Sequence, residues 1–448
     1  MSIPSKPTPR RGARSAAPAV DALPYFAAAA PGLEPLVLAE LQAIGVAGAR
    51  AEAGGVSFGG GDEALYRANM WLRTASRVVL RVARFHAEEF HELERNARKV
   101  EWERFVAPGS TVRFRVTCRK SKLYHSDAVA QRVAAAIAYR LKGGITVVGD
   151  GAAGDDEGDD APDASVAQLF TVRLTHDECV ISADGSGELL HRRGYRQAVA
   201  KAPLRETLAA AALAGAGWTA TAPLVDPMCG AGTIAIEAAL IARDIAPGLG
   251  RDFAFMRWPT FDAARWARLG ERAAARVQPA APAPILASDR DEGAIEAARS
   301  NAARAGVEAD IELSVRPISA IEPPESTRGW VVTNPPYGVR IGEQAGLRNL
   351  YAGLGRTLRE RCVGWELAMV SADRALEGQV GVRFREAFRT SNGGIPVRLV
   401  VGTVEERAVG GSSDGGGAGG GKPGGRPRRG PKPPADEGNA EGEGFEYL

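Results

Sequence analysis

The tetrapeptide Asn334-Pro335-Pro336-Tyr337 has the residue types needed to hold a planar amino group. It follows the apolar run 330–333, which predicts a buried strand, so the four residues lie at the carboxyl end of that strand. The prolines have no N–H and a fixed φ, which stiffens the turn and leaves the Pro335 carbonyl free to accept a hydrogen bond. The Asn334 side-chain oxygen is a second acceptor, and the Tyr337 ring is a face for base stacking. We therefore predict that Asn334, Pro335, Pro336 and Tyr337 are catalytic, although an ordinary turn is the alternative interpretation.

A glycine-rich turn lies upstream, where the apolar stretch 223–225 leads into 226–233 and then into a helical pattern. A strand, a turn and a helix in this order place a ligand at the carboxyl end of a parallel sheet. Gly230 and Gly232 let the backbone approach that ligand closely. Asp226 would repel a pyrophosphate, and G-A-G is shorter than the dinucleotide fingerprint. A cationic ligand such as S-adenosylmethionine fits better, while a helix-capping turn is the alternative.

An acidic residue ends the next predicted strand, 284–289, which precedes a helical pattern over 292–305. In doubly wound folds the acidic residue at the tip of the second strand binds a ribose diol, and we predict this role for Asp289. Asp291 has the type and position of a helix N-cap. The predicted cofactor-binding residues are Asp226, Pro227, Cys229, Gly230, Gly232, Thr233, Asp289 and Asn334.

Strands and helices alternate between residues 224 and 404, which indicates a parallel, doubly wound sheet. The predicted strands are 224–226, 284–289, 311–315, 329–334, 365–371, 384–390 and 395–403, and the predicted helices are 233–243, 292–305 and 346–361. Only Ser391-Asn392-Gly393-Gly394 separates the last two strands, so they form an antiparallel hairpin. The sequence thus predicts an α/β fold with a mostly parallel seven-stranded sheet. Its antiparallel end separates the Rossmann-like class I methyltransferase arrangement from the plain dinucleotide fold.

Composition limits the class of protein. The chain has 448 residues, 45% of them hydrophobic, and a formal net charge of +2, so it can form two or three domains while its charge says little about partners. No apolar run reaches the length of a membrane span, so we expect no membrane contact. The four cysteines are scattered without a C-x-x-C pair, which predicts a reducing, cytoplasmic location and no metal site.

Three segments have the composition of disordered chain. They are the basic residues 1–20, the acidic loop 150–164 and the Gly/Pro-rich residues 407–448. Residues 1–20 lack the apolar core of a secretory signal, and a plain basic tail is a simpler interpretation than an organellar transit peptide.

The region before the predicted sheet interleaves the two kinds of pattern, which indicates an α+β organisation. Helices are predicted at 35–44, 62–69, 90–99 and 126–141, and strands at 111–117, 145–148, 169–174 and 178–183. Two basic clusters lie in this region, and the predicted RNA-contacting residues are Arg119, Lys120, Lys122 and His125 in the first and Arg192, Arg193 and Arg196 in the second. A helix N-terminus after the first cluster adds positive partial charge for phosphates. A solvated face explains the first cluster equally well, and the second could bridge the two halves of the chain.

These motifs together resemble the THUMP-domain class I RNA methyltransferases, and among them the 23S rRNA (guanine-N2)-methyltransferase RlmL group. The resemblance runs from about Tyr25 to Val404, and its specific pieces are 71–77, 190–196, 202–206, D-P-M-C-G-A-G-T at 226–233, 247–262 and N-P-P-Y-G at 334–338. It implies a tail at 1–20, a ferredoxin-like region at 21–84, a THUMP RNA-binding domain at 85–185, a linker at 186–205, a methyltransferase domain at 206–406 and a tail at 407–448.

The resemblance also implies roles for single residues. Asp226, Gly230 and Gly232 would line the methionine end of S-adenosylmethionine, Asp289 its ribose, and Asn334 to Tyr337 the target guanine. One departure concerns the adenine, because related proteins carry an Asp where this chain reads Ser314-Val315-Arg316-Pro317-Ile318. Each motif occurs once, so no second methyltransferase activity is expected.

The expected activity is therefore methylation of the exocyclic N2 amine of a specific guanine in 23S rRNA, as free RNA or in a pre-50S particle. Guanine-N2 methylation of tRNA is the nearest alternative. Adenine-N6 methylation of DNA and glutamine-N5 methylation of protein use the same kind of planar NH2 group, and a non-catalytic RNA-binding or ribosome-assembly factor is a further alternative. Cytosine-C5 methylation is disfavoured because it needs a nucleophilic Cys, and neither Cys229 nor Cys362 lies in the tetrapeptide.

Overall fold

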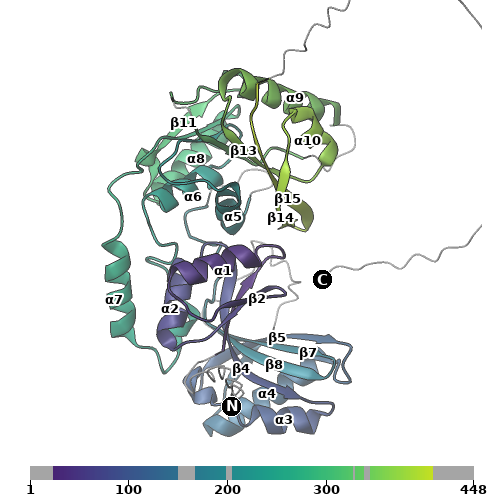
Figure 1. The fold of residues 1–448 in the computed structure, drawn as a ribbon. Helices are drawn as coiled ribbons and strands as arrows, with labels where there is room; N and C mark the ends of the chain where they lie inside the picture. Colours follow the sequence, from purple (N-terminus) through teal and green to yellow (C-terminus); the bar gives the residue numbers. More distant parts are fainter. Residues whose placement is uncertain (1–23, 150–166, 198–203, 326–327, 338–343, 407–448) are drawn as a thin grey trace, which may run out of the picture. The chain divides into compact units, whose positions relative to one another are not determined.

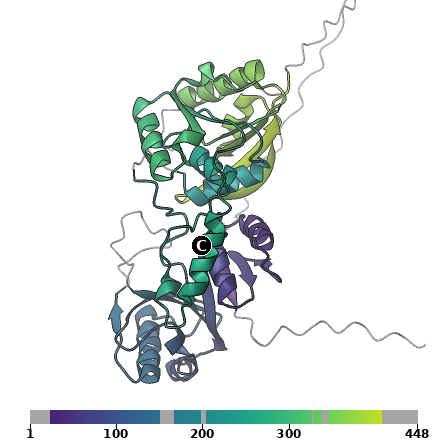
Figure 2. The same ribbon diagram turned by 90° about the vertical axis from the view of Figure 1, so that its left-hand side faces the viewer.

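The computed structural model describes residues 24–149, 167–197, 204–325, 328–337 and 344–406. The segments 1–20, 150–164 and 407–448, for which the sequence predicts disorder, lie outside the described residues. Two sheets organise the rest, one formed by residues 25–184 and one by residues 224–403 (Figures 1 and 2).

The first sheet has eight strands in the order β2-β3-β1-β4-β8-β7-β5-β6. Their bounds are β1 Tyr25–Ala29, β2 Arg50–Glu52, β3 Gly55–Phe58, β4 Ala75–His86, β5 Thr111–Arg119, β6 Thr146–Val148, β7 Gln168–Thr175 and β8 Glu178–Asp184. The long strand β4 pairs antiparallel with β1 on one edge and with β8 on the other, so it joins the strands before it to those after it. The boundary predicted between residues 84 and 85 therefore falls inside one strand.

Four helices accompany this sheet: α1 Glu34–Ala43, α2 Asp62–Trp71, α3 Phe90–Ala97 and α4 Ser126–Leu141. Acidic residues in the first turns of all four complement the positive end of the helix dipole. Trp102, which is fully buried, packs edge-on against Phe170 of β7 with 5.1 Å between ring centroids, and this pair anchors the core under α3 and α4.

The second sheet has seven strands in the order β11-β10-β9-β12-β13-β15-β14. Their bounds are β9 Leu224–Asp226, β10 Ile285–Asp289, β11 Ile311–Val315, β12 Trp330–Thr333, β13 Glu366–Ser371, β14 Arg385–Asn392 and β15 Ile395–Thr403. Neighbours from β11 to β13 are parallel, whereas β15 is antiparallel to both β13 and β14. Gly393 and Gly394 make the turn of the final hairpin with φ values of +55° and +78°, which glycine adopts without strain.

Helices cover both faces of this sheet (Figure 1). They are α5 Glu206–Ala216, α6 Thr233–Ala242, α8 Glu292–Arg304, α9 Gln344–Arg361 and α10 Arg374–Val380. The helix α7 Ala263–Ala274 lies beside α2 instead, where Trp266 packs edge-on against Tyr66 (Figure 1). Successive strand residues point to opposite faces, so Val332 packs in the core that includes α5, α6 and α8, while Val331 packs in the core formed with α9 and α10. The α/β class and the mostly parallel seven-stranded sheet predicted from the sequence are confirmed.

Every strand and helix predicted from the sequence is present within two residues of its predicted bounds. The strands β1 to β4 and the helices α5, α7 and α10 are not predicted by the sequence pattern. β1 reads YFAAA, and alanine favours helices over strands, while the apolar residues of β4 alternate irregularly with arginines. α5 is buried on nearly every side and so has no polar face to give it a helical period. Among the described residues no helix is both long and apolar enough to cross a membrane.

Candidate active site

The glycine-rich turn lies between β9 and α6, at the carboxyl edge of the seven-stranded sheet. Gly230 has φ +51° and Gly232, which caps α6, has φ +83°. A Cβ atom at Gly232 would lie 2.9 Å from the Cβ of Ala298 in α8, so this position requires glycine for both its backbone conformation and its packing. Pro227 lies in the turn, and Thr233 is the buried first residue of α6. The turn is thus held close against the neighbouring βα unit.

The Asp289 carboxylate joins that unit to the turn. Its Oδ2 accepts a hydrogen bond from the Gly230 N–H at 3.0 Å, and its Oδ1 accepts one from the Asp291 N–H at 3.1 Å. The Asp291 side chain accepts bonds from the first N–H groups of α8, so the predicted N-cap is confirmed. Asp289 therefore lies at the tip of the second strand and touches the glycine-rich turn directly.

Asp226 is the buried carboxyl of the site, with an exposed fraction of 1%. Its Oδ1 accepts hydrogen bonds from the Thr333 hydroxyl at 2.8 Å and from the Met228 N–H at 3.3 Å. Burial raises the pKa of Asp226 to about 7, against which the Thr333 hydrogen bond acts, and the neighbouring Asp289 raises it further. A cation beside this carboxyl would favour its ionised form.

Cys229 is buried in the same turn, and burial raises the pKa of its thiol well above the ordinary value. The nearby carboxyls of Asp226 and Asp289 act in the same direction. The thiol stays protonated at neutral pH, so Cys229 is placed to line the turn and not to act as a nucleophile.

The tetrapeptide 334–337, which we call the lip, follows β12 on the strand next to β9. The Oδ1 atom of Asn334 is buried and has no hydrogen-bond partner among the described residues. A buried acceptor without a donor costs free energy, and such a cost is recovered when a ligand supplies an N–H. The lip therefore presents an unused acceptor near the glycine-rich turn.

Two side chains hold the lip from outside. The Asn392 amide, at the end of β14, donates to the Tyr337 hydroxyl oxygen at 3.0 Å, and the buried Tyr351 hydroxyl of α9 donates to the Pro336 carbonyl at 3.3 Å. Tyr337 is partly buried and Pro336 is exposed. Sequence reasoning misses Thr333, Tyr351 and Asn392, because their partners lie 107, 15 and 55 residues away along the chain.

The stretch expected near the adenine lies just after β11. The Arg316 N–H donates to the Asp289 carbonyl at 2.8 Å, which brings residue 316 beside the tip of the second strand. The Arg316 guanidinium pairs with Glu322 at 2.6 Å. This chain therefore has a cationic side chain, already paired, in the place where an acidic one is expected.

The first basic cluster is exposed at the end of β5. Lys120, Lys122 and His125 are exposed, and Arg119 is partly exposed. The Tyr124 ring has an exposed fraction of 68% and stands 4.1 Å from the His125 ring, so an aromatic surface adjoins the charges. Lys122 forms an ion pair with Glu88.

The second basic cluster is largely inside the protein. Arg193 has a side-chain exposure of 2% and pairs with Glu237 of α6 at 2.8 Å, while its other nitrogens donate to the Leu190 and Arg73 carbonyls. Arg196 pairs with Glu206 of α5 at 3.4 Å. Arg192 is partly buried. The RNA contacts predicted for Arg192, Arg193 and Arg196 stay predictions, but the guanidinium groups of Arg193 and Arg196 are already engaged with buried carboxylates.

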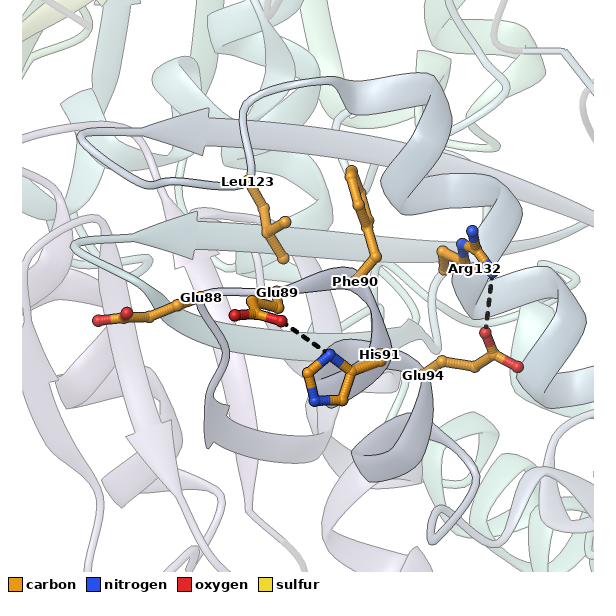
Figure 3. Close-up of a pocket in the computed structure, with 7 residues that line it drawn as sticks. All are labelled: Glu88, Glu89, Phe90, His91, Glu94, Leu123 and Arg132. Atoms are coloured by element: carbon orange, nitrogen blue, oxygen red, sulfur yellow. Dashed lines mark hydrogen bonds and ion pairs between the residues drawn. The ribbon is translucent and has the colours of Figure 1, made fainter.

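A hollow of about 540 Å³ lies beside the first basic cluster, between α3, α4 and the segment before α4 (Figure 3). It is lined by Glu88, Glu89, Phe90, His91, Glu94, Leu123 and Arg132. His91 faces Glu89 at 3.0 Å and Arg132 faces Glu94 at 3.3 Å, so these carboxylates are paired with basic groups (Figure 3). The described residues contain no group of three or more His, Cys, Asp or Glu side chains that could hold a metal ion.

Three family models match the chain. Residues 24–79 match the RlmL ferredoxin-like domain, residues 87–149 the THUMP domain, and residues 193–400 the RMKL-like methyltransferase domain. The domain boundaries predicted from the sequence are not decided by these matches.

Similar proteins span the described fold. A protein of Synechocystis sp. that carries the name of an RNA methyltransferase is 35% identical over 384 residues, which cover 84% of this chain and 96% of that protein. A ribosomal RNA large subunit methyltransferase K/L of Syntrophotalea carbinolica is 36% identical over 84% of this chain, but the match covers 53% of that protein, so this chain spans about half its length. The crystal structure of SMU.472, named as a methyltransferase and solved in complex with SAH, is 28% identical with a TM-score of 0.74, and the match covers 87% of this chain and 99% of that one.

Proposed function

This chain belongs to the family of RMKL-like methyltransferases that carry RlmL ferredoxin-like and THUMP domains, and we propose that it methylates the exocyclic N2 amine of a guanine in 23S rRNA. Its fold is that of an S-adenosylmethionine-dependent methyltransferase, and it is an enzyme of that class. The observation that carries the proposal is the buried Asn334 Oδ1, which has no donor among the described residues and lies on the strand next to the glycine-rich turn.

The residues of the turn fit S-adenosylmethionine. Gly230, which is partly exposed, has no side chain to block a close approach to its backbone, and Gly232 holds the turn against α8. The Asp289 carboxylate at the tip of β10 has the position and charge to bind a ribose diol. The buried Asp226 carboxyl is placed to pair with the cofactor's ammonium, and Pro227, Cys229 and Thr233 complete the wall. When bound, the cofactor supplies an electrophilic methyl group on a positively charged sulfur.

The lip is the proposed binding site of the guanine. Asn334 Oδ1 and the Pro335 carbonyl would each accept one N–H of the exocyclic amine, and the Tyr337 ring would stack on the base. The N2 lone pair is delocalised into the ring and becomes available as the nitrogen turns more tetrahedral. Two acceptors stabilise the N–H hydrogens as positive charge develops, which is an electrostatic effect present mainly in the transition state. No strong base is needed, since the proton is acidic after transfer and can leave to water.

We propose that the exposed basic cluster binds the RNA substrate. Its residues are Arg119, Lys120, Lys122 and His125. Its charges would contact phosphates, and its position inside the stretch that matches the THUMP domain supports this role. The target guanine must be unstacked or single-stranded to reach the lip. Because Arg193 and Arg196 are engaged with Glu237 and Glu206, we leave these two out of the proposed RNA surface.

Alternatives remain within the same chemistry. Guanine-N2 methylation of tRNA uses the same lip, as would adenine-N6 methylation of DNA or glutamine-N5 methylation of protein. The THUMP match favours RNA over the last two, and the K/L relatives favour rRNA over tRNA. The intact acceptor at Asn334 favours catalysis over a purely structural assembly factor. We also propose a cytoplasmic location, which fits the four free cysteines.

The test is to identify the modified nucleoside. Total RNA from a strain that lacks this gene is incubated with the protein and isotopically labelled cofactor, and the labelled nucleoside is mapped by mass spectrometry. N2-methylguanosine at one position of 23S rRNA is the expected result. Label in tRNA would move the assignment to the nearest alternative, and the absence of label from all RNA would refute RNA as the substrate.

A further inference from the structure

Tyr124 lies in the turn between β5 and α4, and its exposed fraction is 68%. Aromatic rings are usually buried in a folded protein, because burial removes a large apolar area from water. The neighbour of this ring is the His125 ring, with 4.1 Å between the ring centroids and 41° between the ring planes. We propose that the Tyr124 ring stacks on an unpaired base of the substrate RNA. This inference rests on the proposed function and deepens it, because it identifies the form of RNA that the first basic cluster binds.

Hydrogen bonds hold the turn that carries the ring. The Ser121 hydroxyl accepts a hydrogen bond from the Asp177 N–H at 2.9 Å, and the Asp177 carboxylate accepts one from the Lys122 N–H at 2.7 Å. These bonds tie the turn to the one between β7 and β8. Leu123, with an exposed fraction of 4%, packs into the core. The backbone around Tyr124 is therefore ordered before any ligand binds, so a base that stacks on the ring pays little for ordering the protein.

A second exposed tyrosine shows what distinguishes Tyr124. Tyr139, in the last turn of α4, has an exposed fraction of 65%, which is nearly the same. The Arg98 guanidinium lies over the Tyr139 ring, 4.2 Å from its centroid, so that ring already has a cationic partner within the protein. The partner of Tyr124 is another aromatic ring, and neighbouring rings form the kind of surface on which bases of single-stranded RNA stack. The two tyrosines thus differ in their neighbours and not in their exposure.

The charges around Tyr124 favour a base over an extended run of phosphates. Lys122 pairs with Glu88, and further carboxylates lie among the basic groups. The basic side chains are Arg119, Lys120 and Lys122, and the acidic ones are Glu88, Asp127 and Asp177. A duplex is bound mainly through its phosphates and its shape, and gains little from a surface of balanced charge. An unpaired base is uncharged and has a face that can stack, so a single-stranded nucleotide fits this surface best. The turn lies within residues 87–149, which match the THUMP domain.

The experiment compares the binding of a single-stranded RNA oligonucleotide and of the same sequence as a duplex to the full-length protein. The variants are Tyr124→Ala and Tyr124→Phe, with Tyr139→Ala as the matched control. We expect Tyr124→Ala to bind the single strand about 5- to 100-fold more weakly, with an unchanged dependence on salt, because a stacked base and not a phosphate contact is lost. Its affinity for the duplex should change by less than about twofold. Tyr124→Phe keeps the ring and should stay within about threefold of the wild type, and Tyr139→Ala within about twofold.

A second measurement locates the contact directly. The oligonucleotide carries 5-iodouridine, which on irradiation forms a cross-link to an aromatic ring stacked against it, and mass spectrometry should find the adduct on Tyr124. Because this side chain is exposed, the thermal unfolding midpoint of Tyr124→Ala should equal that of the wild type. Should that variant unfold at a lower temperature, the affinity of Tyr124→Phe and the cross-link in the wild type decide.

Three results would overturn the stacking site. They are an unchanged affinity of Tyr124→Ala for the single strand, an equal loss for single strand and duplex, and an equal loss in the Tyr139→Ala control. A cross-link that forms elsewhere and not on Tyr124 would overturn it as well. If the wild type transfers no methyl group to any RNA, the proposed function fails, but the binding and cross-linking measurements still decide whether Tyr124 stacks on an unpaired base.

Discussion

The two halves of the candidate active site differ in how their polar groups are satisfied. In the cofactor half, Asp226 accepts hydrogen bonds from Thr333 and Met228, and Asp289 accepts them from Gly230 and Asp291. In the target half, Asn334 Oδ1 has no donor among the described residues. In the first half the carboxylates are hydrogen-bonded within the protein, whereas the second half has a buried acceptor without a donor among the residues that the structure describes.

This difference indicates that the cofactor turn is already ordered, whereas the lip has a polar group that still needs a partner. A turn whose carboxyls already hold backbone N–H groups keeps its shape without ligand, so it can bind cofactor with little rearrangement. The lip is braced from outside by Asn392 and Tyr351, and its unused acceptor is the one that we propose for the target amine. Thr333 connects the halves, because its hydroxyl binds Asp226 and its neighbour in sequence is Asn334.

The largest effect is expected at the lip. Asn334→Ala removes an acceptor that acts mainly in the transition state, so methyl transfer should fall by about 10³-fold, to background. The cofactor affinity, measured by calorimetry with S-adenosylhomocysteine, should change by less than about threefold. A parallel loss of cofactor affinity would show that Asn334 belongs to the cofactor half. The proposed division of roles between the two halves would then be wrong.

A substitution in the cofactor half should instead weaken cofactor binding. Asp226→Asn keeps the shape and the Oδ1 acceptor for Thr333 but removes the charge, so cofactor affinity should fall by about 10- to 100-fold. The matched control is Asp291→Asn, because asparagine caps α8 as well as aspartate does. Equal cofactor affinities for Asp226→Asn and the wild type would contradict the proposed ammonium contact.

The pH dependence of cofactor affinity tests the proposed contact between Asp226 and the ammonium more closely. The pKa of Asp226 is raised to about 7 in the structure without ligand, so the carboxyl holds a proton below that pH. A cationic ammonium favours the ionised form, so binding at pH 6 must release this proton, and affinity should rise about tenfold from pH 6 to pH 8. Calorimetry in buffers of different ionisation enthalpy measures the proton count. In Asp226→Asn the release at pH 6 should vanish, and its persistence would assign the proton to another group, such as Glu206.

The smallest effect concerns the brace of the lip. Asn392→Ala removes the amide that orients the Tyr337 ring, so kcat/KM for RNA should fall by about three- to tenfold while cofactor affinity stays unchanged. Tyr337→Phe removes the other end of the same hydrogen bond, and the double variant should lose no more than the larger single loss. Fully additive losses would mean that the bond does not act on the reaction.

The seven-stranded sheet is predictable from the sequence because β9, β10 and β12 each end in a motif and the other strands alternate with helices or form a hairpin. The runs before Asp226, Asp289 and Asn334 are apolar, and the helices after the first two have clear caps or glycines. The strands β1 and β4 escape prediction because their residues, rich in alanine and arginine, fit a sheet only through tertiary contacts, and β2 and β3 have only three and four residues.

The two basic clusters show that composition alone does not predict which arginines are exposed. The sequences around Arg119 and Arg193 look equally suited to RNA, yet the first group is largely exposed and Arg193 is buried with Glu237. Glu237 lies in the apolar helix α6, and a carboxylate in such a setting is a signal that a buried cation must pair with it. Its partner cannot be identified from spacing, because the two residues are 44 positions apart.

The most direct test of the central claim is a crystal structure of the protein with S-adenosylhomocysteine and a fragment of its RNA. The account predicts that the N2 amine of an unstacked guanine lies within hydrogen-bonding distance of Asn334 Oδ1 and the Pro335 carbonyl, on the side that faces the cofactor's sulfur. A lip that points away from the sulfur, or an Asn334 amide that is satisfied by protein groups alone in that complex, would contradict it.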